Sequence, residues 1–134
     1  MFVTETRYRT SIELSEELRV LCVYAMEVHS HLGPGLLESI YEACLCHEFD
    51  RAGLAYTRQQ PLPVKYKGHD IDCQFRLDLV VEQNLLLEIK AVHQIHPIHE
   101  AQLLTYLRVS GLKLGLLLNF NELRLKDGIG RRRI

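Results

Sequence analysis

The sequence predicts an α/β domain built on a mixed central β-sheet flanked by helices. Two stretches of helical apolar spacing, at residues 13–31 and about 36–51, precede a series of short strand-like runs. A further helix begins at Pro97 and ends before Gly111. The apolar run "KLGLLLNF" at 113–120 then has the composition of a strand buried on both faces. The predicted order is α, α, β, β, β, α, β, with room for one short strand at the end.

The bounds of these elements follow from the residues that interrupt them. "GPG" at 33–35 separates the first two helices, and Gly53 supplies the stop signal of the second. "TRQQPLPVKY" at 57–66 alternates in polarity and contains prolines, which predicts an edge strand followed by a turn at Lys67-Gly68. The run "FRLDLVVEQNLLLEIKAV" at 75–92 then reads as two apolar strands joined by a short polar turn.

Length and composition indicate one globular domain, residues 1–134. The longest apolar stretches are too short to span a bilayer, and the opening "MFVTETRYRTSIEL" lacks the apolar centre of a secretory signal. We therefore expect a cytoplasmic protein that does not enter membranes. The four cysteines include no C-x-x-C pair, so we expect buried thiols rather than a zinc or iron–sulfur site.

Charge is distributed unevenly along the chain. The net charge is −1, but residues 121–134 carry about +3, which leaves the remainder near −4. Such a tail fits either contact with phosphates or a solvated terminus. From the small size of the domain and the charge of its tail, we expect a homodimer or a partner protein.

Three charged residues, Asp78, Glu88 and Lys90, lie inside the apolar strands of the run 75–92. Burying an ion costs several kcal/mol unless it is paired or bound to a metal. Residues two apart share a strand face, so Glu88 and Lys90 project to the same side. A carboxylate and an ammonium so placed suit a site with a metal and an attacking water. A half-exposed strand with solvated Glu and Lys explains the same pattern.

The position of Asp78 depends on the length of the hairpin loop. A two-residue loop at Gln83-Asn84 would place Asp78 opposite Ile89, whereas a three-residue loop from Glu82 to Asn84 places it opposite Glu88. We predict the three-residue loop, with Asn as its left-handed residue. Since opposed carboxylates repel, this register also predicts a divalent cation between them.

Two helices add polar residues at helical spacing. Glu38 and Tyr41 lie three apart, and His99, Gln102 and Tyr106 fall at i, i+3 and i+7. A solvated first-turn acid and ordinary packing of tyrosines account for the same residues. His93, His96 and His99 form H-x-x-H-x-x-H, but Pro97 interrupts a continuous helix through them, so we expect no dedicated zinc site.

The blocks "GLLESIY", "FRLDLVV", "LLLEIKAV" and "HEAQLLTYL" together resemble the GxxExxY family, which is placed in the PD-(D/E)XK nuclease superfamily. The resemblance runs from about residue 15 to "LKDGI" near the end. One departure from the pattern is that Leu77, not Pro, precedes Asp78. The resemblance implies the fold predicted above and a metal-dependent nuclease that hydrolyses phosphodiester bonds.

The resemblance also implies roles for individual residues. The catalytic residues would be Glu38, Asp78, Glu88 and Lys90. A Mg²⁺ or Mn²⁺ ion would be held by Asp78, Glu88, the carbonyl of Ile89 and Glu38, as hard cations prefer oxygen ligands. Lys90 would orient the attacking water or stabilise developing negative charge. Substrate would contact Gln102, Tyr106, His99 and Tyr41. The Q-x-x-x-Y pattern of Gln102 and Tyr106 favours DNA over RNA and an exonuclease mode.

Two other functions fit the sequence. One is a catalytically inactive nuclease fold that binds nucleic acid or protein, which the low net charge favours slightly because strong duplex binding usually needs a basic surface. The other is a structural protein whose charged strand residues form an internal salt-bridge network. Divalent-dependent cleavage that is lost in Lys90→Ala would separate the enzyme from both.

Overall fold

The structure, a computed structural model, describes residues 11–72 and 75–134. Cys73, one of the four cysteines of the sequence, lies outside these residues; of the others, Cys46 is buried, whereas Cys22 and Cys44 are half-buried. The helices are α1 (Ser11–Leu32), α2 (Glu38–Ala52), α3 (Pro97–Ser110) and the short 3-10 helix η1 (Leu125–Gly128). The strands are β1 (Tyr56–Pro61), β2 (Val64–Tyr66), β3 (His69–Ile71), β4 (Arg76–Val81), β5 (Leu85–Lys90), β6 (Leu114–Asn119) and β7 (Ile129–Arg133).

The central sheet has the strand order β1-β4-β5-β6-β7. Strands β5 and β6 are parallel and every other neighbouring pair is antiparallel, so the sheet is mixed, as predicted. A parallel pair needs a crossover connection, and α3 supplies it between β5 and β6. Helix α3 ends at Gly111, which has φ 80°, the left-handed conformation that glycine adopts most readily.

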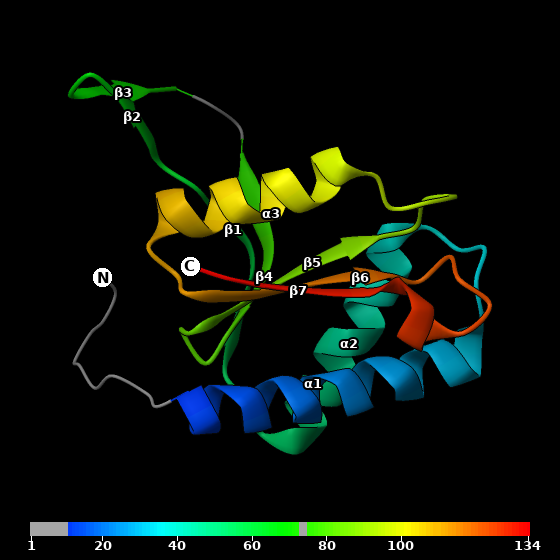
Figure 1. The fold of residues 1–134 in the computed structure, drawn as a ribbon. Coiled ribbons are helices and arrows are strands. Elements are labelled where there is room, and N and C mark those ends of the chain that lie inside the picture. Colours follow the sequence, from blue (N-terminus) through cyan, green and yellow to red (C-terminus); the bar gives the residue numbers. More distant parts are fainter. Residues whose placement is uncertain (1–10, 73–74) are drawn as a thin grey trace.

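Helices cover both faces of this sheet (Figure 1). Helix α3 lies over one face, and α1 and α2 lie over the other. Alternate residues of β5 serve the two layers: Leu87 and Ile89 pack with α1 and α2, whereas Leu86 packs with α3. Every residue of β6 is buried, which confirms the prediction of a strand covered on both sides.

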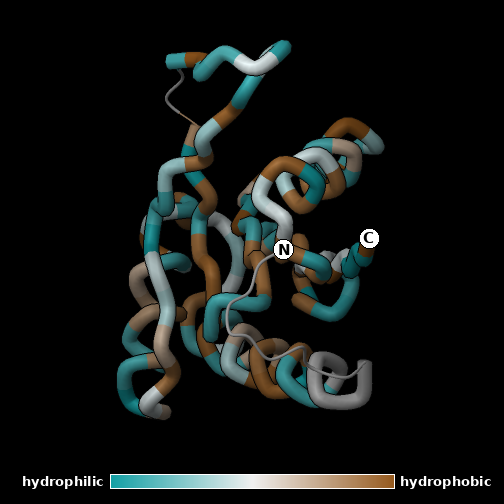
Figure 2. The backbone as a smooth tube through the Cα atoms, turned by 90° about the vertical axis from the view of Figure 1, so that its left-hand side faces the viewer, coloured by the Kyte–Doolittle hydropathy of each residue, from teal (hydrophilic) through white to brown (hydrophobic). Residues whose placement is uncertain are grey.

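The segment predicted as one edge strand at 57–66 is divided in two. Strand β1 forms the sheet edge up to Pro61, and β2 then pairs with β3 in a separate two-stranded sheet that extends away from the body of the molecule (Figures 1 and 2). Pro61 and Pro63 lack the N–H that would continue the ladder. The predicted turn is present, and Lys67 and Gly68 both have positive φ, 50° and 83°, as a tight hairpin requires.

The basic C-terminal segment is not simply a solvated terminus. Arg131, Arg132 and Arg133 belong to β7, which pairs with β6 at the edge of the sheet. Arg132 forms an ion pair with Glu100 of α3, so this part of the tail is fixed against the fold.

Candidate active site

The loop between β4 and β5 sets the register of the two central strands. Val81 pairs with Leu85 and Leu79 pairs with Leu87, which confirms the predicted three-residue loop. Continued by one residue, the same register places Asp78 opposite Glu88. The left-handed residues are Glu82 and Gln83, with φ 53° and 60°, so the prediction of a left-handed Asn was wrong. Asn84 instead closes the loop by donating its side-chain amide to the Glu82 carbonyl at 2.6 Å.

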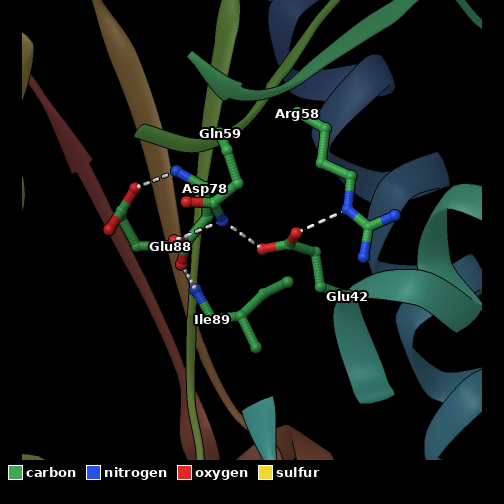
Figure 3. A network of polar contacts seen from close by, with 6 residues as sticks. All are labelled: Glu42, Arg58, Gln59, Asp78, Glu88 and Ile89. Carbon is green, nitrogen blue, oxygen red and sulfur yellow. Dashed lines mark hydrogen bonds and ion pairs between the residues drawn. The ribbon is translucent and has the colours of Figure 1, made fainter. Parts of the chain in front are cut away.

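Beyond the Leu79–Leu87 pair, the carboxylates of Asp78 and Glu88 accept the backbone hydrogen bonds that strand carbonyls accept in a regular ladder (Figure 3). The backbone N–H of Asp78 donates to Glu88 Oε2 at 3.0 Å, and the N–H of Ile89 donates to Asp78 Oδ2 at 2.8 Å. Leu79 packs on the α1 and α2 side but Leu77 packs on the α3 side, although the two are only two residues apart. Strand β4 therefore turns over at Asp78, where it separates from β5.

The two carboxylates are electrostatically coupled. Glu88 is 5% exposed, and burial, followed by the charge of Asp78, raises its pKa to about 8. Burial also raises the pKa of Asp78, with further contributions from the negative charges of Glu42 and Glu38. Lys90 acts in the opposite direction on the pKa of Glu88. Near neutral pH the Asp78–Glu88 pair therefore retains a proton unless a cation compensates its charge.

Glu38 reaches the carboxyl end of β5, at the residue that follows Lys90 in the chain. Glu38 is the first residue of α2, and its Oε2 accepts the backbone N–H of Ala91 at 3.1 Å. Lys90 immediately precedes Ala91 and is half-buried. A hollow of about 540 Å³ is lined by Glu38, Ser39, Glu42, Arg58, Gln59 and Asp78. Glu38 and Asp78, 40 residues apart in the sequence, thus border the same hollow.

Helix α3 brings two of its predicted residues to this region. The pKa of Tyr106 is raised by burial and then by the negative charges of Glu88 and Asp78, and its ring meets that of Phe75 edge-on at 5.1 Å. The pKa of His99 is lowered by burial and then by Lys90, and its Nδ1 accepts the N–H of His96. Gln102 is half-buried and lies one turn from each of them on the same helix.

Tyr41, predicted to contact substrate, does not reach the surface. Its side chain is fully buried and stacks on Phe120 with ring centroids 4.5 Å apart. The hydroxyl donates to the Gly33 carbonyl at 2.6 Å and accepts the N–H of Leu36 at 3.1 Å. Tyr41 is therefore a structural residue that holds the turn before α2. The spacing of three suggested a face shared with Glu38, but Glu38 opens the helix and is exposed, whereas Tyr41 faces the core.

Three further residues of the site were missing from the sequence prediction. Glu42 is buried at 6% exposure, and its Oε2 lies 2.6 Å from Arg58 Nε. Gln59 Nε2 donates to Glu42 Oε1 at 2.8 Å and lies 3.4 Å from Asp78 Oδ1. Glu42 follows Glu38 by four residues, and this helical spacing was the available signal. The sequence carries no such signal for Arg58 and Gln59, because their strand approaches α2 only in the folded chain.

The donor atoms suit a hard divalent cation. Among the residues the structure describes, no three His, Cys, Asp or Glu side chains are grouped as a complete metal site, and this holds for the histidines at 93–99. Mg²⁺, however, is commonly bound through one or two carboxylates and several waters. Asp78 and Glu88 supply the carboxylates, and their mutual repulsion is what a cation relieves. The N–H and C=O of one strand residue point to the same neighbour, so the Ile89 carbonyl is directed to the same gap.

Comparison with known protein families agrees with this geometry. A family model described as the PD-(D/E)XK nuclease superfamily matches residues 15–132. The chain therefore belongs to the PD-(D/E)XK nuclease superfamily. No curated protein and no solved structure matches the chain in the corresponding comparisons. Within residues 11–72 and 75–134, the structure contains no helix that could span a membrane.

Proposed function

We propose that this chain is a metal-dependent nuclease that hydrolyses phosphodiester bonds. The observation that carries the proposal is the pair of crossed hydrogen bonds that joins Asp78 and Glu88 where strands β4 and β5 separate. Lys90 follows Glu88 by two residues on β5. These are the positions that the resemblance to the GxxExxY family assigns to the superfamily's acidic and basic residues. Burial and mutual charge make the pair costly to ionise in the metal-free protein, which is expected for groups retained to hold a cation.

Asp78, Glu88 and the Ile89 carbonyl would hold Mg²⁺ or Mn²⁺, and Glu38 would bind it directly or through water. When bound, such an ion acidifies a water molecule and offsets negative charge on the phosphate. Lys90, at the end of β5, would orient that water or stabilise the charge that develops on the phosphate. The hydrogen bonds from the Asp78 and Ile89 amides fix one oxygen of each carboxylate. Glu88 Oε1 and the remaining lone pairs of Asp78, whose Oδ1 also lies 3.4 Å from Gln59 Nε2, are left to the ion.

Gln102, Tyr106 and His99 would position the substrate backbone from α3. The Q-x-x-x-Y pattern favours DNA over RNA and attack at chain ends. The remaining elements of the proposal are a cytoplasmic location and a homodimer or partner protein that enlarges the small nucleic-acid-binding surface. Light scattering of the purified chain tests the dimer, and a monomer at working concentration would remove it.

An inactive binding module is the second candidate. It is favoured by the crossed hydrogen bonds, because Asp78 and Glu88 each satisfy a backbone N–H and so serve the fold even without a cation. A module of this kind would bind nucleic acid or protein and leave the phosphodiester bond intact.

The test is a panel of labelled DNA and RNA substrates, single- and double-stranded, with Mg²⁺, Mn²⁺ or a chelator. We expect divalent-dependent cleavage that falls about a hundredfold or more in Lys90→Ala. Lys113→Ala is the matched control, since Lys113 is exposed and precedes β6 at the end of the sheet opposite Lys90. Binding without cleavage would favour the module, and equal cleavage by both variants would remove Lys90 from the mechanism.

A further inference from the structure

Gln59 occupies a backbone conformation that few side chains adopt. It has φ 54°, in the left-handed region, within strand β1. Its neighbours are regularly paired, Arg58 with Leu79 and Gln60 with Leu77, so Gln59 lies opposite Asp78 at the one interrupted position of this ladder. Strained residues of this kind cost free energy and are concentrated at functional sites.

The side chain of Gln59 joins two acids that belong to different elements (Figure 3). Its Nε2 donates to Glu42 Oε1 on α2 at 2.8 Å and contacts Asp78 Oδ1 on β4 at 3.4 Å. Glu42 is in turn fixed by Arg58 through its other oxygen. The Asp78 carboxylate is thus held on one side by the Ile89 N–H and on the other by an amide that is anchored to a helix.

The chemistry of an amide suits this position. A neutral donor can satisfy two carboxylates at once without cancelling the negative charge that a cation needs. A lysine here would compete with the cation, and a glutamate would add a third repelling charge. Each carboxylate oxygen accepts more than one bond, so the contact with Gln59 leaves Asp78 able to bind an ion.

We propose that Gln59 is a positioning residue: through its side-chain amide, anchored on Glu42, it fixes the Asp78 carboxylate in the orientation that receives the divalent cation. This inference rests on the proposed function. Residues that orient metal ligands from the second layer typically contribute 10–100-fold to metal affinity.

Two substitutions separate the side chain from the backbone at this position. Gln59→Ala and Gln59→Gly both remove the amide, but only glycine relieves the left-handed strain. We expect Gln59→Gly to unfold at higher urea concentration than Gln59→Ala. We also expect both to bind Mn²⁺ about tenfold or more weakly than the unsubstituted chain in calorimetry. The matched controls are Lys67→Ala and Lys67→Gly, at a left-handed residue in the β2–β3 turn, which should differ in stability and bind Mn²⁺ normally.

Each outcome bears on the proposal. If Gln59→Gly recovers normal Mn²⁺ affinity while Gln59→Ala does not, the position matters only for backbone shape and the proposal is wrong. Normal affinity in both variants overturns it as well. If the unsubstituted chain binds no Mn²⁺, the metal site of the proposed function is refuted, and the role of Gln59 falls with it. If the unsubstituted chain binds Mn²⁺ and only the expected loss of affinity in the Gln59 variants is missing, the role of Gln59 is wrong and the proposed nuclease still stands.

Discussion

Replacing Glu88 with glutamine tests the electrostatics of the site by a stability measurement that needs no activity assay. The pKa of Glu88 rises from its ordinary 4.5 to about 8 in the folded protein, because of burial and then the charge of Asp78. Between pH 4.5 and about pH 8, Glu88 therefore keeps its proton in the folded state but has lost it in the unfolded state. Under linkage, the free energy of unfolding of the metal-free protein falls as pH rises through this window.

The size of this effect follows from the two pKa values. Each pH unit between them is worth about 1.4 kcal/mol, so the whole window amounts to about 5 kcal/mol at most. Glutamine has nearly the same shape and remains neutral. Glu88→Gln should therefore match the unsubstituted protein near pH 4.5 and be more stable by several kcal/mol at pH 8.

Urea unfolding in the presence of a chelator, at intervals from pH 5 to pH 8, measures the difference. The other titrating groups are present in both proteins, so the difference between the two curves reports the ionisation of Glu88 together with its coupling to Asp78. Added Mn²⁺ at pH 8 should raise the stability of the unsubstituted protein and leave the variant unchanged. Parallel curves without metal would show that Glu88 is already ionised in the free protein and that folding does not raise its pKa.

Two further predictions concern buried packing positions. Tyr41→Phe removes a buried hydroxyl that bonds Gly33 and Leu36, so the free energy of unfolding should fall by about 1–3 kcal/mol in urea titrations. Weaker substrate binding at unchanged stability would instead return Tyr41 to the substrate site. In Gly128→Ala the new Cβ would lie 2.5 Å from the Asn119 carbonyl oxygen, so we expect a loss of about 1–3 kcal/mol. An unchanged melting temperature would contradict this.

The arrangement of the two central strands was predicted most accurately where it depends on local pattern. The two-residue side-chain period of a strand placed Glu88 and Lys90 on the same face of β5. The length of the hairpin loop placed Asp78 opposite Glu88. Neither inference required knowledge of distant contacts. The prediction was wrong for Tyr41, because spacing along a helix gives relative direction but does not say which side faces the core.

The division of the 57–66 segment shows a similar limit. Alternation and prolines indicated an edge strand, and β1 is one. Local pattern did not show that the chain would leave the sheet after Pro61 and form the β2–β3 pair on its own, because pairing partners are chosen by tertiary position. The C-terminal arginines likewise acquire their place only through pairing of β7 with β6.

The mixed sheet with its helices, and the acids and lysine of the central strands, could be derived from the amino-acid sequence alone. Strand period, turn length and helix stops are properties of neighbouring residues. The contact of Arg58 with Glu42, and the link that Gln59 makes between Glu42 and Asp78, could be seen only in the folded chain. These residues come from a helix and an edge strand whose approach depends on how the whole core packs. Burial, which raises the pKa of Glu88, is likewise a property of that packing and not of the strand alone.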